Sequence, residues 1–460
     1  MYSRGLQCWC TVLLSLSTAP VLGSLQVVPG GTWTASNGEH LNAHGAGVIK
    51  VNDTFYLVGE DKSQGSAFVN VNCFSSADLV QWKYEGALLS RTSTTASGDL
   101  GPGRIIERPK VIYNDKTQKY VLWMHVDSSS YGEAKVGVAT GDTVCGKYTY
   151  LRSFKPLGFE SRDMGLFKDD DGTAYLLTED RKNGIRINKL TPDYLDVLEG
   201  TYLWKDHIEA PALVKYNSRY YMFGSHLTGW DANDNVYSTS TSLASGWSAW
   251  ATFAEPKSNT YTSQTAYILD YGNGNIMYLG DRWVSKNLQA STYVWLPLLF
   301  SGDGKVSMKN HASWVPNVGG GSWEGRGNYT TYIGTNGKYS GGAKDVSCGA
   351  CAGGKAAGYV GGSDQGTVTM TGIRGSGDTT GAATTTTVQI RYVNADSKPR
   401  YAGVTVNGGQ VMKVAFEPTS GDTSVSILNV VLRSGENTVT IGGIDGGWGP
   451  DVDRLLVPTQ

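Results

Sequence analysis

Polar and apolar positions follow one pattern five times along the first two thirds of the chain. Each repeat begins with a polar residue, passes through a short apolar run, turns at polar or glycine residues, and returns as a strand rich in aromatic residues. The repeats begin at His44, Glu107, Asp163, Glu209 and Gln264. Consecutive starts lie 63, 56, 46 and 55 residues apart, as expected of four-stranded blades with variable loops. The pattern therefore predicts a five-bladed β-propeller.

The five polar residues that begin the repeats are candidates for one shared pocket. In a propeller the first strand of every blade lines the central axis, so residues far apart in sequence converge there. Three of the five are the carboxylic acids Glu107, Asp163 and Glu209. A carboxylate at such a position is costly unless it has a partner or a function. The acids could therefore carry chemistry, or they could pair with arginines such as Arg108 and Arg162.

The pattern changes after residues 315–322, a glycine-rich stretch with few apolar residues. Charge is sparser beyond it, and alternating runs such as 385–393 and 424–432 predict the antiparallel strands of a β-sandwich or jelly roll. We expect an all-β chain in four parts. These are a signal peptide (1–23), a five-bladed propeller domain (24–317), a linker (318–322) and a β-sandwich domain (323–460).

Composition narrows the classes of partner. The 39 Lys and Arg residues nearly balance the 41 Asp and Glu residues, and no dense basic stretch exists, which argues against nucleic acid and anionic membrane surfaces. The 26 Tyr and 13 Trp residues suit stacking on sugar rings, although packing in the core accounts for most of them. We expect a monomer that acts on a carbohydrate.

The first 23 residues resemble a secretory signal. Arg4 gives a basic start, residues 11–22 form the apolar region, and small residues follow at the expected cleavage site. The apolar run is too short to span a bilayer. Two glycosylation sequons, at Asn52 and Asn328, agree with export. We expect a secreted, extracellular glycoprotein.

Removal of the signal would leave four cysteines in an oxidising compartment, which allows three pairings. Two lie in the first domain and two in the second, so pairing within each domain is the simplest expectation. The four are Cys73, Cys145, Cys348 and Cys351.

Three carboxylic acids around one channel suit the hydrolysis of a glycosidic bond. One acid must protonate the leaving oxygen, and an inverting enzyme needs a base about 6.5–9.5 Å away to activate water. A further carboxylate raises the pKa of the acid by like-charge repulsion and keeps it protonated near neutral pH.

Two motifs add a resemblance to a known family. The repeats, the phrase SADLVQW at 76–82 and the phrase EAPAL at 209–213 resemble glycoside hydrolase family 43, a family of inverting five-bladed propellers. The resemblance covers about residues 40–310. It implies that Glu209 is the general acid and that Asp163 tunes its pKa and orients it. It implies no cofactor for catalysis.

One departure from that family concerns the first blade. The family usually has an Asp-Pro pair there, whose Asp is the base, whereas this chain has His44-Gly-Ala. Together with Glu107 in the second blade and Gln264 in the fifth, this resembles the fungal exo-β-1,3-galactanase branch, which commonly carries a family 35 carbohydrate-binding module. The identity of the catalytic base stays open. The candidates, in order, are Gln264, which would act by positioning water, then Glu107, then His44. Further substrate contacts are expected at Glu60, Tyr131 and Asp281, with walls from Trp230 and Trp283.

The second domain is similar to family 35 modules through its final GGWGPDVDRL phrase. That resemblance implies a structural Ca²⁺ held by Glu324 and Asp453, although Arg326 stands where a second acid is usual. Candidate sugar contacts are the loop residues Tyr359, Asn407, Trp448 and Asp451.

The resemblance implies a secreted inverting exo-β-1,3-galactanase that releases galactose from the non-reducing ends of β-1,3-galactan, as in plant cell-wall arabinogalactan. Two alternatives stay open. An enzyme of the same fold could be an α-L-arabinofuranosidase or a β-xylosidase, and a protein that lacks the usual base could be a non-catalytic carbohydrate-binding propeller.

Overall fold

The computed structural model describes residues 25–92, 98–320, 322–375 and 383–459, so the predicted signal peptide lies outside the described residues. The first part of the chain forms five four-stranded antiparallel sheets, each made of strands consecutive in sequence. The sheets are β2 (His44–Val51), β3 (Thr54–Glu60), β4 (Asn70–Ser76) and β5 (Lys83–Ser90); β6 (Ile105–Asn114), β7 (Lys119–Asp127), β8 (Lys135–Gly141) and β9 (Thr149–Phe154); β10 (Met164–Lys168), β11 (Ala174–Asp180), β12 (Gly184–Leu190) and β13 (Val197–Trp204); β14 (Ile208–Tyr216), β15 (Arg219–His226), β16 (Val236–Ser240) and β17 (Ala251–Thr252); and β18 (Gln264–Gly272), β19 (Asn275–Arg282), β20 (Thr292–Phe300) and β21 (Val306–Met308).

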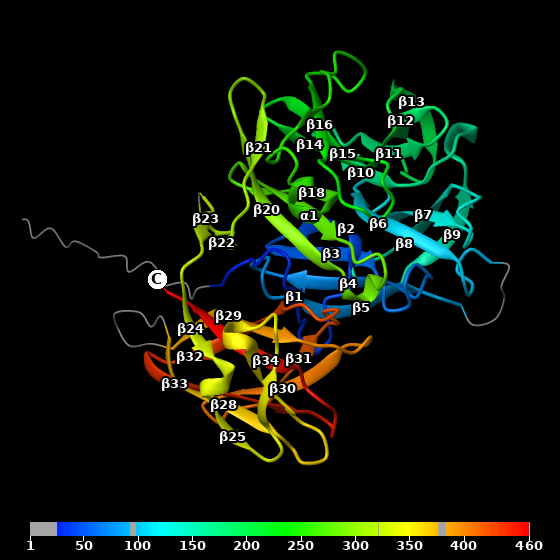
Figure 1. Cartoon of the computed structure of the whole chain (residues 1–460). Coiled ribbons are helices and arrows are strands. Elements are labelled where there is room, and N and C mark those ends of the chain that lie inside the picture. The colour runs from blue at the N-terminus through cyan, green and yellow to red at the C-terminus, as the bar shows by residue number, and fades with distance from the viewer. Residues whose placement is uncertain (1–24, 93–97, 321, 376–382, 460) are drawn as a thin grey trace, which may run out of the picture.

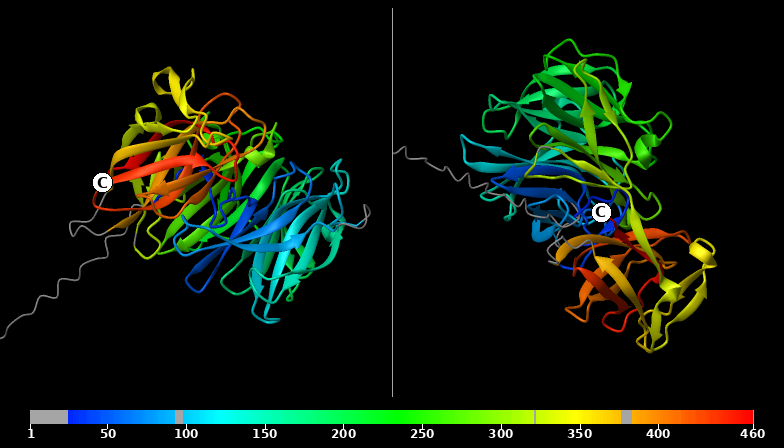
Figure 2. Two further views of the ribbon diagram at one scale, coloured as in Figure 1. Left: turned by 90° about the horizontal axis from the view of Figure 1, so that it is seen from below. Right: turned by 90° about the vertical axis from the view of Figure 1, so that its left-hand side faces the viewer.

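The five sheets are arranged in a closed, propeller-like ring. The first strands of neighbouring sheets contact one another in the order β2, β6, β10, β14 and β18, and β18 contacts β2 again. Figure 1 shows this part in blue, cyan and green, and Figure 2 shows it from two further sides. Apolar side chains fill the space between neighbouring sheets. Trp123 and Val138, for example, pack with Met164 and Leu176 of the next sheet. The five predicted repeats are thus the five sheets.

A bulge near the start of the first strand recurs in several sheets. The pairing with the second strand shifts register between His44 and Gly47, between Glu107 and Lys110, and between Glu209 and Ala212. In these three sheets the residue after the leading polar residue has a positive φ: 54° at Gly45, 55° at Arg108 and 54° at Ala210. Bulges of this kind re-aim side chains near functional sites.

The C-terminal part is a β-sandwich of two packed sheets, drawn in yellow, orange and red in Figure 1. Apolar side chains such as Ile390, Val404 and Leu455 fill the space between the sheets. One sheet has the order β1 (Thr32–Trp33), β32 (Ser424–Leu432), β29 (Thr384–Val393), β34 (Asp451–Pro458), β27 (Lys355–Gly358) and β26 (Lys344–Ser347), with β24 (Tyr329–Ile333) also on β34. The other has the order β25 (Lys338–Ser340), β28 (Thr367–Gly375), β33 (Gly435–Gly443), β30 (Arg400–Val406) and β31 (Met412–Phe416).

A segment before the ring joins the two parts. Residues 26–43, the N-terminal strap, contain β1, which pairs in parallel with β32 of the sandwich. Trp33 of this strand also packs edge-on against Trp295 of the ring, with ring centroids 4.6 Å apart. Farther along the strap, His40 Nδ1 lies 3.1 Å from a carboxylate oxygen of Glu417 in the sandwich. The strap therefore contacts both domains at once.

The strands on either side of the predicted linker pair with each other. They are β22 (Ser313–Val315) and β23 (Glu324–Arg326). Helical structure among the described residues is short: α1 (Asn259–Thr262), η1 (Pro156–Gly158), η2 (Leu288–Ala290), η3 (Gly334–Asn336) and η4 (Ala352–Gly354). No helix in the described ranges has the length and apolarity to cross a membrane.

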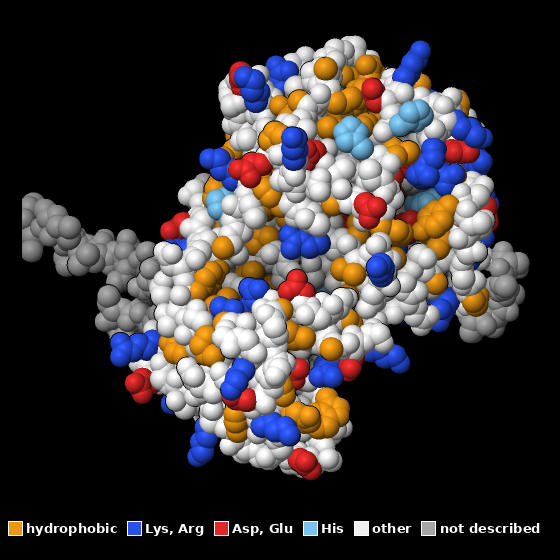
Figure 3. Space-filling view, in the orientation of Figure 1, with side chains coloured by type: hydrophobic (Ala, Val, Ile, Leu, Met, Phe, Trp, Pro, Cys, Tyr) orange, Lys and Arg blue, Asp and Glu red, His pale blue; other side chains and the backbone are white. Residues whose placement is uncertain are grey.

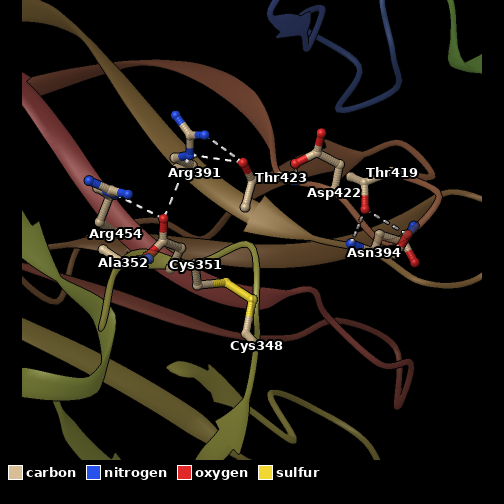
Figure 4. Close-up of a disulfide and its surroundings, with 10 residues drawn as sticks. Cys348, Cys351, Ala352, Arg391, Asn394, Thr419, Asp422, Thr423 and Arg454 are labelled. Carbon is tan, nitrogen blue, oxygen red and sulfur yellow. Dashed lines mark hydrogen bonds and ion pairs between the residues drawn. A yellow bond between two sulfur atoms is a disulfide. The ribbon is translucent and has the colours of Figure 1, made fainter. Parts of the chain in front are cut away.

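Both disulfides form within domains, as predicted. Cys73 pairs with Cys145 in the ring, across 72 residues of sequence, and Cys348 pairs with Cys351 in the sandwich (Figure 4). On the face drawn in Figure 3, basic and acidic side chains are interspersed over both domains.

Candidate active site

A pocket of about 210 Å³ opens where the first strands of the ring begin. It brings together all four predicted catalytic residues: Glu107, Asp163, Glu209 and Gln264. The pocket also includes two of the predicted substrate contacts, Glu60 and Tyr131, and the two predicted walls, Trp230 and Trp283.

In four of the five sheets the second strand supplies a partner for the leading residue of the first. Glu107 pairs across strands with His125, Glu209 with Ser225 and Gln264 with Asp281. His44 pairs in the same way with Glu60. A side chain directly across an antiparallel pair is close enough to interact, so in these four sheets the leading residue has a polar neighbour on the second strand.

Glu209 has the protonation state that a general acid needs. It is buried, and its Oε1 accepts a hydrogen bond of 2.8 Å from the Nε2 of Gln264. Burial raises the pKa of Glu209, and the carboxylates of Asp163 and Glu179 raise it further, to about 9. Arg108 and Arg181 oppose this only in part. The Glu209 carboxyl therefore carries a proton at neutral pH.

Asp163 is positioned by an arginine. It directly precedes β10, and its Oδ2 lies 2.8 Å from a guanidinium nitrogen of Arg108. One of the three acids, Asp163, thus pairs with Arg108, as the sequence suggested. The same carboxylate also raises the pKa of Glu209. The same guanidinium group donates to Gln264 Oε1 and to the backbone oxygen of Thr265, and so connects three sheets.

Glu107 has the opposite protonation state. Its Oε1 accepts hydrogen bonds from Lys62 Nζ at 3.1 Å and from the Tyr131 hydroxyl at 3.0 Å, and its Oε2 lies 3.5 Å from His125 Nδ1. Burial alone would raise the pKa of Glu107, but Lys62 and His125 outweigh it and hold that pKa well below its usual range. The pocket thus contains an ionised Glu107 and a protonated Glu209.

A buried row of charges supports Glu107. His125 Nε2 lies 3.0 Å from Asp127, and the pKa of His125 is raised to about 9 because Asp127 and Glu107 outweigh the effect of burial. Lys62 Nζ lies 2.5 Å from Glu60, whose pKa burial raises to about 7 although Lys62 opposes the rise. These groups fix Glu107 from two sides.

Two predicted residues lie behind the pocket rather than on it. Asp281 was expected to contact substrate, but it is 1% exposed and its two oxygens bind His44 Nδ1 and the backbone N–H of Gly45. His44 is fully buried and packs on Tyr293. Neither reaches the pocket surface, so His44 does not fit the role of base and Asp281 does not fit that of a substrate contact. The hydrogen bond between them holds both side chains away from the pocket surface.

The predicted calcium ligands do not fit a cation. Asp453 is fully buried, and its carboxylate accepts hydrogen bonds from Arg454 and from the backbone N–H of Ala352. Arg391 lies 3.7 Å away; Figure 4 shows both arginines beside the disulfide. Glu324 pairs with Arg326 on β23. No cluster of three or more acidic, His or Cys side chains suited to a metal occurs among the described residues.

The sandwich presents two exposed aromatic rings. Tyr359 and Trp448 are each 47% exposed, and their ring centroids lie 6.1 Å apart. We call this pair the aromatic face. Lys344 Nζ lies 4.4 Å from the Tyr359 ring. Asp451 begins β34, and its carboxylate lies next to Gly358, the neighbour of Tyr359.

Asn407 does not join the aromatic face. It follows the end of β30, and its side chain exchanges hydrogen bonds with Asn437 and Thr438 near the start of β33. Trp448 follows the other end of β33, since Val406 pairs with Val439 whereas Ala402 pairs with Gly443. The motif placed Asn407 in a loop without indicating at which end of the sandwich that loop lies.

Several pocket residues were not predicted, and most carried a signal. Glu179, His125 and Arg181 on the pocket, and Lys62 behind it, lie near the end of the return strand of a repeat. Counting polar residues that close each hairpin, as well as those that open it, would have found them.

Two protein-family models match separate parts of the chain. Residues 42–285 match Glycosyl hydrolases family 43, and residues 372–457 match a CBM13-like module described as Alpha-galactosidase, CBM13 domain. A carbohydrate-binding module is thus confirmed, with a family number that differs from the family 35 resemblance.

Solved structures match over nearly the whole chain. A crystal structure of exo-β-1,3-galactanase from Phanerochaete chrysosporium with β-1,3-galactotriose is 37% identical, with coverage of 94% of this chain and 100% of that one and a TM-score of 0.66. An exo-β-1,3-galactanase from Clostridium thermocellum is 25% identical, with coverage of 93% and 99% and a TM-score of 0.62. A curated Vibrio xylan 1,3-β-xylosidase is 26% identical over 193 residues, which are 38% of this chain and 34% of that protein's length.

Proposed function

Since the chain belongs to glycosyl hydrolases family 43, we propose that it is a secreted, monomeric, inverting exo-β-1,3-galactanase whose five sheets are the blades of a five-bladed propeller. The substrate would be β-1,3-galactan, from which single galactose units leave the non-reducing end. The proposal of substrate rests on the two galactanase structures that match the chain.

One observation carries the proposal of hydrolysis: the pocket holds two carboxyl groups in opposite protonation states. Burial and two neighbouring carboxylates raise the pKa of Glu209 to about 9, whereas Lys62 and His125 keep Glu107 ionised. Groups whose environments separate their pKa values in this way are the usual acid and base pair of an enzyme.

The steps follow from these groups. Glu209 donates its proton to the leaving glycosidic oxygen, and Asp163 keeps that proton on Glu209 by like-charge repulsion. Water attacks the anomeric carbon from the opposite face, which inverts its configuration. Gln264 helps to position the sugar and the water, because its amide is fixed beside Glu209. Glu107 is the ionised carboxylate that can receive the proton of the water.

Product analysis tests the proposal. The purified protein would be incubated with β-1,3-galactan, arabinan and xylan, and the products and their anomeric configuration followed by NMR. We expect galactose alone, released first as the α-anomer from a β-linkage. Release of arabinose or xylose would favour the alternative enzymes of this fold. Binding of galactan without any product would favour a non-catalytic propeller.

A further inference from the structure

The side-chain amide of Gln264 is held in one orientation by four partners. Its Oε1 accepts hydrogen bonds from Arg108 at 2.6 Å and from Trp283 Nε1 at 2.9 Å. Its Nε2 donates to Glu209 at 2.8 Å and to Ser225 Oγ at 3.1 Å. Turned over, the amide would direct its N–H groups at the two donors, neither of which can accept a hydrogen bond. Arg108 and Trp283 therefore decide which end of the amide faces the acid.

Trp283 is only partly buried, so its position depends on what packs against it. It follows β19, outside the hydrogen bonds of the sheet. Its ring lies edge-on to Trp230 with centroids 4.9 Å apart, and Lys62 Nζ lies 5.9 Å from it. Trp230 is in a loop, and Lys62 is bound to carboxylates. Of the two rings beside Trp283, that of His44 is the fully buried one, and its centroid lies 5.2 Å away.

His44 is itself rigidly held. Its ring stacks on Tyr293 with centroids 4.7 Å apart and planes 18° from parallel. Its Nδ1 lies 3.0 Å from an Asp281 oxygen, and Asp281 is directly across the strand pair from Gln264. Burial lowers the pKa of His44 although Asp281 opposes the shift, so the ring is neutral and its Nδ1–H donates to Asp281.

We propose that His44 is a positioning residue for Gln264: its ring holds Trp283 in the place from which the indole N–H fixes the amide oxygen. The inference rests on the proposed function only where it assigns Gln264 a part in hydrolysis. It also gives a role to the residue that stands where a catalytic aspartate was expected. His44 acts from behind the pocket, without touching substrate or water.

A matched pair of substitutions separates the ring from its hydrogen bond. His44→Asn keeps a donor for Asp281 but removes the ring that backs Trp283. His44→Phe keeps the ring and removes the donor. We expect His44→Asn to lower kcat about tenfold or more with KM changed less than about threefold, and His44→Phe to retain most of kcat. Equal losses in both variants, or a larger loss in His44→Phe, would overturn the proposal.

His40→Asn is the matched control. His40 is a buried histidine whose carboxylate partner, Glu417, lies in the sandwich; its ring lies edge-on to that of His44 with centroids 6.2 Å apart, so it tests whether loosened packing beside His44 is enough to lower kcat. Its substitution should lower the melting temperature and leave kcat nearly unchanged. A loss of kcat equal to that of His44→Asn would mean that general loosening of the packing around His40 and His44 explains both results.

A double-mutant cycle tests the route through Trp283. Trp283→Phe removes the indole N–H and keeps an aromatic ring. If His44 acts through that N–H, His44→Asn should lower kcat far less in the Trp283→Phe background than in the wild type, because coupled residues are not additive. Full additivity of the two losses would contradict the proposal, even if His44→Phe failed to fold.

A substrate-independent signal separates this inference from the proposed function. With 5-fluorotryptophan incorporated, the ¹⁹F resonance of Trp283 can be assigned by its loss in Trp283→Phe. We expect it to shift or broaden in His44→Asn and to stay in place in His40→Asn. An unchanged resonance in His44→Asn would refute the positioning role. A shifted resonance in a protein that releases no galactose would refute the proposed function and leave the positioning role standing.

Discussion

The pocket of the ring buries its charged groups, whereas the aromatic face of the sandwich exposes its rings. Glu107 and Glu209 are 7% and 5% exposed, and both Tyr359 and Trp448 are 47% exposed. Burial of charge in the pocket is offset by a network in which each carboxyl group has a cation, a hydrogen-bond donor or a proton. The aromatic face needs no such network, because an exposed ring is neutral and costs little to leave in water.

The difference shows which physical property each region uses. Shifting a pKa by several units requires removal from water and a few fixed neighbouring charges. Holding a sugar requires a flat apolar surface with some polar groups at its edge, which remains accessible to a polymer. The ring is therefore suited to bond cleavage and the sandwich to attachment. Substitutions in the two regions should accordingly affect different measurements.

The largest expected effect is that of Glu209→Gln. It removes the proton donor and keeps the shape and the hydrogen-bonding capacity of the side chain. We expect kcat on β-1,3-galactan to fall about a thousandfold, as for loss of a general acid, with the affinity for galacto-oligosaccharides within about threefold. Turnover and calorimetric binding would be measured on the same preparation. Retained turnover would assign the acid elsewhere.

The two disulfides give the next largest contrast. The Cys73–Cys145 bond closes 72 residues, and the Cys348–Cys351 bond only 3. On the chain-entropy estimate, replacing the first pair by serine should lower the free energy of unfolding by about 4 kcal/mol and replacing the second by about 2 kcal/mol. Denaturant unfolding of both double variants would show whether the order holds.

The leading residues of the five repeats were predictable because a propeller fixes where the first strands lie. Glu107, Asp163, Glu209 and Gln264 all reached one pocket although up to 157 positions separate them in sequence. The pattern could not predict the residues that contact these leading residues from behind. Whether Lys62 binds Glu107, or whether His44 faces the pocket or the core, depends on side-chain packing between sheets. That packing has no periodic signal in the sequence.

The sandwich shows a different limit. Alternation predicted its strands, but strand order is not local, so Asn407 was placed with Trp448 although opposite ends of β33 separate them. The calcium ligands were predicted from motif positions alone. Those positions do not show that arginine side chains occupy the space around Asp453, where a cation would have to bind. The strap was also unexpected, because two residues of β1 give no pattern that assigns them to the sandwich.

A pH profile of Asp163→Asn would sharpen the account of the pocket. The negative charge of Asp163 raises the pKa of Glu209, which stands at about 9, so its removal must lower that pKa. Glu209 would then lose its proton at a lower pH. In a plot of kcat against pH, the alkaline limb should therefore move to lower pH by about one pH unit or more. At neutral pH a shift of one unit leaves most of Glu209 protonated, so this cause alone should lower kcat there by less than about twofold.

Glu179→Gln, which removes the neighbouring carboxylate with the smaller effect on Glu209, is the control. The alkaline limb of its pH profile should move in the same direction by less. An alkaline limb that stays in place in both variants would mean that burial alone sets the pKa.

The smallest effect is expected on the aromatic face. Trp448→Ala removes a ring that is 47% exposed, so the melting temperature should change little. Retention on insoluble β-1,3-galactan should weaken about tenfold, which corresponds to about 1.4 kcal/mol, a reasonable value for one stacked ring. Hydrolysis of a soluble trisaccharide should stay at the wild-type rate, because the trisaccharide needs only the ring pocket. Val431→Ala, at another exposed apolar side chain of the sandwich, is the control and should keep retention intact. If Trp448→Ala slowed the trisaccharide as much as the polymer, the sandwich would be part of the catalytic site, and the division of attachment from cleavage would not hold.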